Sequence, residues 1–347
     1  MRKISDFFEC KLLFLISEMV RLTFANICDT ILKSSPQKIK GELVMIKKGP
    51  ITGTFIDEIT FDIPSSNWSH DQWKKDLDYM QEIGIDTVIF IRGGFEDKSV
   101  FPSKVLGTSY ADDLAGLIFE ETSKRDMNVI FGAYISNGDW NRGDYATELK
   151  INQKFINEVY ERYNDYPSFA GWYIPHETTR DVLNISEIML GLSAICKDKT
   201  PDKKIMMSPI FRGQVSGSGD YFTPERHADE WDRLFTKAGK DIDICAFQDG
   251  SAPMSLMEEY YTVTREVCKK HNIEHWVNAE TFERDVRHMY YPIPFQLLKR
   301  RLELHKKYAD KIITFEFSHF LSPQSIYPSA RNLNNLYKEF YLKDSNT

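Results

Sequence analysis

From residue 51 onward, short runs of apolar and β-branched residues alternate with longer stretches in which apolar residues recur at helical spacing. Each such pair of segments is typical of a βα unit, in which a buried strand is followed by a helix that packs against the sheet. The pattern occurs eight times, with strand starts about 32 to 41 residues apart. The expected strands are Ile51–Ile56, Thr87–Ile91, Asn128–Ile135, Phe169–Ile174, Lys204–Ile210, Ile242–Phe247, Glu274–Ala279 and Lys311–Phe317.

Three segments between these strands carry residues that commonly begin helices. Ser69 with Gln72, and Ser255 with Glu258, match the capping-box pattern, in which the first side chain accepts a bond from the third helical N–H. Thr223 stands before a proline, which combines a hydroxyl cap with a residue suited to the first helical turn. We therefore expect helices to begin at these three places.

Eight βα units in some 270 residues match a (β/α)8 barrel, or TIM barrel, in both number and length. The alternative is a doubly wound open sheet, which would usually have about five to seven strands and a glycine-rich first turn. This sequence has no such turn. It therefore predicts an α/β protein with a single barrel domain at residues 46–347 and an N-terminal extension at residues 1–45.

The extension differs from the rest of the chain. Arg2 and Lys3 precede the apolar run Leu12–Ile16, as in a signal peptide, but charged residues on both sides leave that run shorter than usual in an export signal. We expect either an additional helix or a poorly ordered segment here. A cytoplasmic location is slightly favoured, and export is left open by the family resemblance described below.

Composition narrows the function further. The 347 residues are 42% hydrophobic and 27% charged, which is typical of globular proteins. The net charge of −7 argues against a general nucleic-acid binder, and no apolar run is long enough to span a membrane. The five cysteines include no CxxC pair, and we expect Cys196, Cys245 and Cys268 to be reduced packing residues.

Polar and aromatic residues follow nearly every expected strand. In a barrel of this type the functional site lies at the carboxyl ends of the strands. A carbohydrate site needs aromatic rings that stack on sugar faces and polar groups that bind hydroxyls. The residues that we expect to contact such a substrate are Asp57, Arg92, Tyr134, Trp140, Trp172, His176, Gln248, Asp249 and His319.

Two glutamates stand out among the residues at the strand ends. Glu177 follows the fourth expected strand and Glu280 follows the seventh, so that in an eight-stranded ring they face one another across the mouth. Glycoside hydrolysis needs such a pair, with one carboxyl group to protonate the leaving oxygen and one carboxylate to attack or to activate water. We therefore expect these two residues to be catalytic. This chemistry requires no cofactor.

The arrangement resembles the superfamily of retaining (β/α)8 glycoside hydrolases that includes cellulases and β-galactosidases. More narrowly, the segments 171–177, 247–250 and 276–282 are similar to an uncharacterised glycosidase-like barrel family of bacterial proteins. The resemblance covers roughly residues 51–341. It implies that Glu177 is the general acid/base, that Glu280 is the nucleophile, and that Arg92 lies near the nucleophile.

Three positions depart from the superfamily pattern. His176 stands where an asparagine usually grips the sugar 2-hydroxyl, Gln248 stands near the place of a frequent tyrosine, and His319 and Phe320 stand near the place of a frequent tryptophan. These changes leave the two carboxylates in place and concern the choice of substrate. His176 either binds substrate in place of the asparagine or is held by neighbouring groups, and both interpretations stay open.

The expected electrostatics follow from the two roles. Burial and the charge of Glu280 would raise the pKa of Glu177, and Arg92 would keep Glu280 ionised.

Two other functions remain open on the sequence. One is a metal-dependent sugar-processing barrel enzyme, in which carboxylates at the mouth hold a divalent ion. The other is a non-catalytic glycan-binding barrel.

Overall fold

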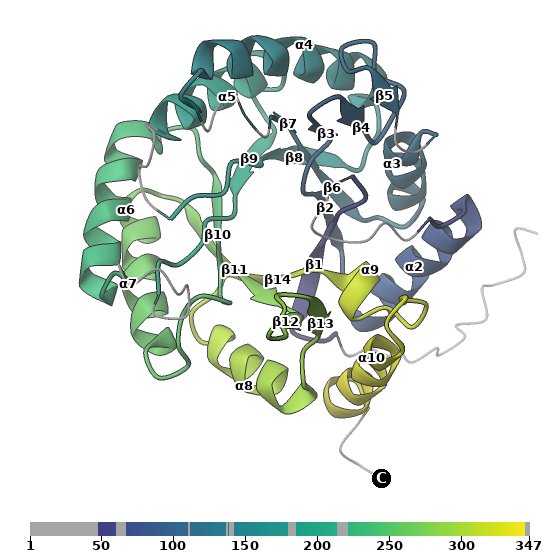
Figure 1. Cartoon of the computed structure of the whole chain (residues 1–347), viewed down its shortest axis with the longest axis vertical. Coiled ribbons are helices and arrows are strands. Elements are labelled where there is room, and N and C mark those ends of the chain that lie inside the picture. Colours follow the sequence, from purple (N-terminus) through teal and green to yellow (C-terminus); the bar gives the residue numbers. More distant parts are fainter. Residues whose placement is uncertain are drawn as a thin grey trace, which may run out of the picture. The chain divides into compact units, whose positions relative to one another are not determined.

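The computed structural model describes residues 48–59, 67–109, 112–136, 138, 142–179, 185–213 and 221–343. The N-terminal extension predicted at residues 1–45, and Trp140, lie outside these residues. Within them, eight parallel strands form a closed barrel, and the helices form a ring around it (Figure 1). Because the sheet closes on itself, the barrel prediction is confirmed and the open doubly wound sheet is wrong.

Each barrel strand is followed by a helix in the order expected from the sequence. The strands are β1 (Ile51–Ile56), β2 (Thr87–Phe90), β6 (Asn128–Gly132), β8 (Phe169–Ile174), β9 (Lys204–Met207), β10 (Ile244–Gln248), β11 (Glu274–Glu280) and β14 (Lys311–Phe315). The helices that follow them are α2 (His70–Ile83), α3 (Leu114–Lys124), α4 (Tyr145–Tyr163), α5 (Ile185–Lys199), α6 (Pro224–Ala238), α7 (Met257–Lys270), α8 (Phe295–His305) and α10 (Pro328–Tyr341), with the short α9 (Phe317–Phe320) before α10.

Two of the three predicted helix starts are correct. Ser69 caps α2 in a complete capping box with Gln72, and Thr223 caps α6 in front of a first-turn proline. The capping box expected at Ser255 is wrong, because α7 begins at Met257 after a residue that makes no side-chain cap.

Small additional sheets lie at the carboxyl end of the barrel. The stretch predicted as one strand at Asn128–Ile135 divides after β6 (Asn128–Gly132), and its end forms β7 (Tyr134–Ile135) in a side sheet with β3 (Gly94–Phe95), β4 (Lys98–Ser99) and β5 (Thr108–Ser109). After β11 the chain forms an antiparallel hairpin of β12 (Phe282–Arg284) and β13 (Tyr290–Pro292).

The core has two layers separated by the barrel wall. One large cluster of buried apolar residues fills the space between strands and helices, and a smaller one fills the barrel interior. Strand β11 shows how one strand serves both layers. Trp276 belongs to the interior cluster, whereas Val277 and Ala279 belong to the outer one. Alternation therefore directs Asn278 and Glu280 inward, above Trp276.

Other features agree with the sequence. The three cysteines expected to pack in the core, Cys196, Cys245 and Cys268, are buried and form no disulfide. No helix in the described part of the chain is long and apolar enough to cross a membrane.

Candidate active site

A pocket opens among the carboxyl ends of the barrel strands and holds both predicted catalytic glutamates. Its wall combines residues that follow the strands with residues of the β12–β13 hairpin. The lining residues are Ile91, Arg92, Glu177, Gln248, Asn278, Glu280, Phe282, Arg284, Tyr290 and Phe315. Glu177 follows the fourth barrel strand and Glu280 ends the seventh, so the topology brings together two residues that are 103 positions apart.

Glu280 is held closely by the segment after β10. Its backbone N–H donates a hydrogen bond to Oδ1 of Asp249 at 2.9 Å. Its carboxyl group lies directly against Gly250, where a Cβ atom would overlap both carboxyl oxygens. Position 250 therefore needs glycine because the Glu280 carboxyl group occupies the space of a side chain.

Burial raises the pKa of Glu280 to about 8, and the charge of Asp249 acts in the same direction. Arg284 and Arg301 oppose this shift and are the cations with the largest effect on the carboxyl group. The expectation that Arg92 keeps Glu280 ionised is therefore wrong. Arg92 lines the pocket and forms an ion pair with Asp57, at 3.9 Å.

Asp249 does not line the pocket and instead lies behind its wall, against α8. Its side chain is fully buried, with an oxygen 3.7 Å from Arg301 and the other 3.3 Å from His305. These two residues are four positions apart on α8, so both project from the same face of that helix. Burial lowers the pKa of His305 to about 3, so it meets Asp249 as a neutral ring, and burial also raises the pKa of Asp249. The substrate contact predicted for Asp249 is therefore wrong.

His176 has a similar supporting position next to Glu177. Its Nε2 lies 2.9 Å from Glu148 Oε1, and both side chains are fully buried. The same Glu148 oxygen accepts the backbone N–H of Ser136 at 3.0 Å. Burial lowers the pKa of His176, which keeps the ring neutral. Of the two interpretations of His176, the structure favours the residue held by its neighbours, although the partner is a side chain of α4.

Several predicted substrate contacts point away from the pocket. The indole of Trp172 is fully buried in the outer core and donates to Thr200 Oγ1 at 2.9 Å. Tyr134 packs in the same outer core, with its ring 6.4 Å from that of Phe155. Neither of these two residues, both predicted to contact substrate, is among the residues that line the pocket.

Asp57 and His319 are also buried. The Asp57 side chain is 1% exposed and is bound to Arg92, so it supports a pocket residue without lining the pocket. His319 lies on α9 and is bonded to Glu316, with its side chain 1% exposed. Gln248, in contrast, lines the pocket as expected, and its amide Nε2 donates to the Ser208 carbonyl oxygen at 2.8 Å.

The β12–β13 hairpin contributes to the pocket in a way that the sequence pattern did not indicate. Phe282, Arg284 and Tyr290 line the pocket, and none of them was expected there. Two of them could have been found from the sequence. Phe282 and Arg284 stand two and four positions after Glu280, and alternate residues of an extended segment lie on one face. In the part of the chain that the structure describes, no group of three His, Cys, Asp or Glu residues could hold a metal ion.

Comparisons with known proteins agree with this architecture. Residues 51–327 match the family described as "Domain of unknown function (DUF4434)". The chain belongs to this family. No curated protein matches it.

Among solved structures, a protein of Bacteroides thetaiotaomicron VPI-5482 that carries the provisional name α-L-fucosidase is 34% identical, with a TM-score of 0.81. The match covers 90% of this chain and 100% of that one. A β-galacturonidase of Eisenbergiella tayi, at 11% identity and a TM-score of 0.55, shares the fold over 87% of this chain and 53% of its own. A β-galactosidase of the psychrophilic Marinomonas ef1, at 8% identity and a TM-score of 0.54, shares it over 83% and 59%. Glycoside hydrolase barrels are thus among the structures that this DUF4434 chain resembles.

Proposed function

We propose that this DUF4434 protein is a glycoside hydrolase that acts by the retaining, double-displacement mechanism. One observation carries the proposal: the glutamates that follow the fourth and seventh barrel strands line the same pocket. Two carboxyl groups at one pocket are what this chemistry requires. The structural similarity to glycoside hydrolase barrels supports a glycosidase-type function.

In the proposed reaction the two glutamates have different tasks. Glu177 donates its proton to the glycosidic oxygen while the Glu280 carboxylate attacks the anomeric carbon, so that the C–O bond to the leaving group breaks as the bond to Glu280 forms. Glu177 then takes a proton from water, which attacks the same carbon and releases Glu280. Asp249 and Gly250 position the nucleophile, because one holds its backbone N–H and the other makes room for its carboxyl group.

The electrostatics of Glu280 predict the pH dependence of this reaction. Glu280 must lose its proton before it attacks, and its pKa is raised to about 8. The acidic limb of the kcat/KM profile of the free enzyme should therefore have its midpoint near pH 8 and level off only above that pH.

Two variants and one product analysis test the proposal. Aryl glycosides with different sugars, including an α-L-fucoside suggested by the name of the similar Bacteroides protein, serve as substrates. Glu177→Ala should slow substrates with poor leaving groups by about 10²- to 10⁴-fold and those with activated leaving groups far less, since only the former need the acid. Glu280→Ala should abolish turnover of both kinds. The matched control is Glu187→Ala, on the exposed face of α5, which should leave turnover unchanged.

The configuration of the first product decides the mechanism. A product with the anomeric configuration of the substrate, followed by NMR before mutarotation, supports double displacement. An inverted product, or full activity of Glu280→Ala, would overturn the proposal. Binding without turnover of any glycoside would favour the glycan-binding barrel, and loss of activity with a chelator would favour the metal-dependent enzyme.

A further inference from the structure

Two amide side chains form a polar layer directly above the apolar interior of the barrel. Gln248 of β10 and Asn278 of β11 are paired in the parallel register of these strands, and both line the pocket. Two positions earlier on the same strands, Ala246 and Trp276 are also paired and belong to the interior apolar cluster. Because side chains alternate along a strand, all four residues face the inside of the barrel. The two amides therefore form the floor of the pocket on this side.

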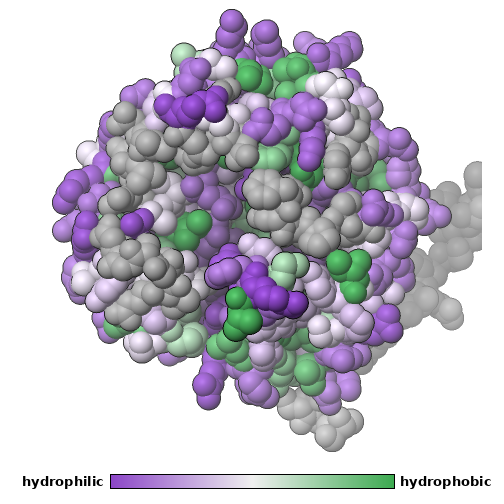
Figure 2. Space-filling model, viewed as in Figure 1, coloured by the Kyte–Doolittle hydropathy of each residue, from purple (hydrophilic) through white to green (hydrophobic). Residues whose placement is uncertain are grey.

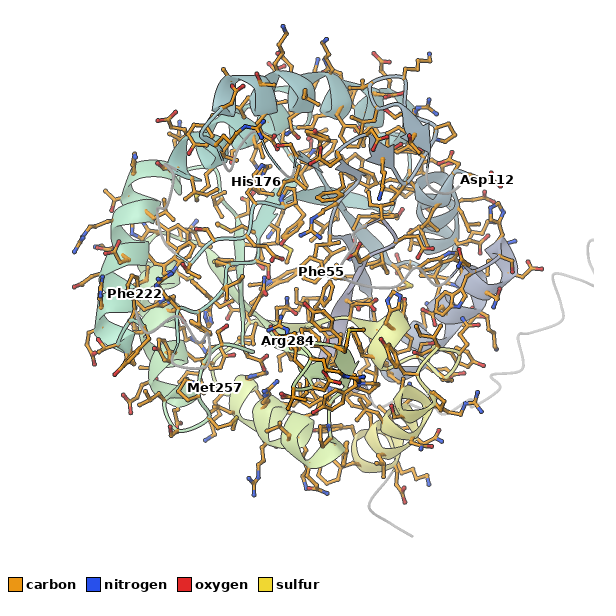
Figure 3. The ribbon with its side chains drawn as sticks, in the orientation of Figure 1. Phe55, Asp112, His176, Phe222, Met257 and Arg284 are labelled. Atoms are coloured by element: carbon orange, nitrogen blue, oxygen red, sulfur yellow. The ribbon has the colours of Figure 1, made fainter. Side chains whose placement is uncertain are left out.

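The opposite side of the pocket comes from the β12–β13 hairpin. In Figure 3, Arg284 of this hairpin lies inside the ring of helices, and Figure 2 shows strongly hydrophilic side chains over the hairpin. Glu280 stands two positions after Asn278 on the same face of β11, so the two side chains begin about 7 Å apart along the strand. One sugar ring can span this distance. A ring whose anomeric carbon faces Glu280 therefore reaches the amide floor.

Both amides are anchored on Ser208, which follows β9. Asn278 Nδ2 donates to Ser208 Oγ at 3.3 Å, and Gln248 Nε2 donates to the Ser208 carbonyl oxygen at 2.8 Å. The Ser208 hydroxyl donates its single proton to the carbonyl oxygen of Ala246 at 2.8 Å. Ser208 therefore presents only acceptors to the two amides.

These partners determine which way each amide faces. An amide group has a nitrogen that donates and an oxygen that accepts, and only the nitrogen can bond to an acceptor. The oxygens of Asn278 and Gln248 are therefore turned away from Ser208. Asn278 Oδ1 is buried and has no hydrogen-bond partner in the described part of the chain, and Gln248 makes its one side-chain hydrogen bond there through Nε2. The floor thus keeps two acceptor oxygens unused.

We propose that Asn278 and Gln248 select the sugar by accepting hydrogen bonds from two neighbouring hydroxyl groups of the ring that Glu280 attacks. The inference rests on the proposed glycosidase function. Gln248 was expected from the sequence to contact substrate, and Asn278 was not. A buried acceptor without a partner favours a ligand that donates to it and disfavours one that cannot. The substrate class is therefore a sugar with two adjacent free hydroxyl groups, neither of them deoxygenated, methylated or sulfated.

A scan of modified sugars tests the direction of these hydrogen bonds without any variant. The probes are the methyl glycosides of glucose, galactose and fucose, each with a single deoxy or fluoro replacement at C2, C3 or C4, and calorimetry measures their binding. Fluorine has no proton to donate, so an acceptor floor rejects both replacements. The wild-type protein should lose about 10- to 100-fold in affinity at two adjacent positions with either one. Fluoro sugars that bind as well as their parents at every position would overturn the inference, as would the absence of binding by every parent sugar.

Variants connect this discrimination to particular residues. Asn278→Leu removes the acceptor and should weaken binding of the parent sugar by about 10- to 100-fold, whereas Asn278→Asp keeps an oxygen at the same place and should recover part of that loss. Ser208→Ala frees the Asn278 amide to turn its nitrogen toward the ligand, so the difference between hydroxyl and fluoro sugars should narrow. The matched control is Asn334→Leu on α10, which should bind like the wild type. Asn334 is buried and unpartnered within the described residues, and it does not line the pocket.

Turnover of aryl glycosides separates this inference from the proposed hydrolysis. Unchanged affinity and kcat/KM of Asn278→Leu would overturn the inference and leave the two-glutamate mechanism standing. Equal losses in Asn278→Leu and Asn334→Leu would also overturn it, because they would trace to the loss of a buried amide in general. Binding with the expected discrimination but without turnover would support the inference and refute the hydrolysis.

Discussion

Replacing Gly250 by alanine tests whether the position of the Glu280 carboxyl group is built into the backbone. An alanine methyl group at position 250 would overlap three atoms of that carboxyl group, Cδ and both oxygens, where ordinary contacts between heavy atoms are about 3.5 Å long. The carboxyl group therefore has to move by at least about 1 Å. A displacement of that size at a reacting group costs roughly 10²-fold in rate, or about 2.7 kcal/mol in the activation free energy.

The same overlap affects folding, which gives a measurement independent of any substrate. Overpacking a well-filled site costs about 1–3 kcal/mol in the free energy of unfolding. In the Glu280→Ala background the carboxyl group is absent, so the added methyl group at position 250 meets far less. The cost of Gly250→Ala should then fall well below its value in the wild-type background, as a double-mutant cycle with urea denaturation would measure.

The matched control is Gly107→Ala. A Cβ atom at Gly107 would have no heavy atom within 4 Å among the described residues, so this variant should keep full activity and lose no stability. An equal cost of Gly250→Ala in both backgrounds would refute the reasoning, as would a Gly250→Ala protein with wild-type kcat/KM.

Three further predictions follow from the buried charges. Asp249→Asn removes a negative charge that raises the pKa of Glu280, so the acidic limb of the kcat/KM profile should move to lower pH; an unmoved or raised limb would contradict this. Glu148→Ala removes the acceptor of the Ser136 N–H and the partner of His176, and should cost about 1–3 kcal/mol in urea denaturation, whereas Glu148→Gln should cost less. Because the folded state binds the Glu280 proton more tightly than the unfolded state, wild-type stability falls as pH rises from about 4.5 to about 8. Glu280→Gln lacks this loss and should gain on the order of 4 kcal/mol over the wild type at pH 8, with no gain below pH 4.5. A stability difference that does not change with pH would contradict this prediction.

The barrel could be predicted because its signal is repeated and local. The bounds of β1 and β8 were predicted correctly, since a proline or a polar residue stands on each side of both strands. The two glutamates could be placed because barrel topology alone brings the ends of the fourth and seventh strands to one mouth. None of this required knowledge of which face a side chain takes.

The predicted substrate contacts of the aromatic residues were less successful, because they depended on which face of a strand each side chain takes. Strand β8 is buried on both sides and reads as a nearly continuous apolar run, so its sequence does not reveal which residues point inward. The irregular register between β6 and β8 adds to the difficulty, because a shift of one residue exchanges the faces. Trp172 consequently packs outside, and its neighbour Tyr173 fills the barrel interior.

Supporting residues could not be predicted because their partners are distant in the sequence. Asp249 looks like a substrate ligand when only the end of its strand is considered, and the two residues of α8 that bury it lie about 50 positions later. Glu148 lies 28 positions before His176 along the chain. Such contacts depend on how helices settle against the barrel wall, which no local pattern records.

Arg301 of α8 links the segment that holds Glu280 to the β12–β13 hairpin. One of its terminal nitrogens lies 3.7 Å from Asp249 Oδ1, the atom that accepts the Glu280 N–H, and the other lies 2.9 Å from Glu283 on β12. A single buried guanidinium group thus contacts both the residue that holds the Glu280 backbone and the outer face of the hairpin. Arg284 occupies the inner face of the same strand, so the contact between Glu283 and Arg301 also helps to hold Arg284 at the pocket wall. The hairpin side of the pocket and the backbone of Glu280 are therefore held in place by the same buried residue of α8.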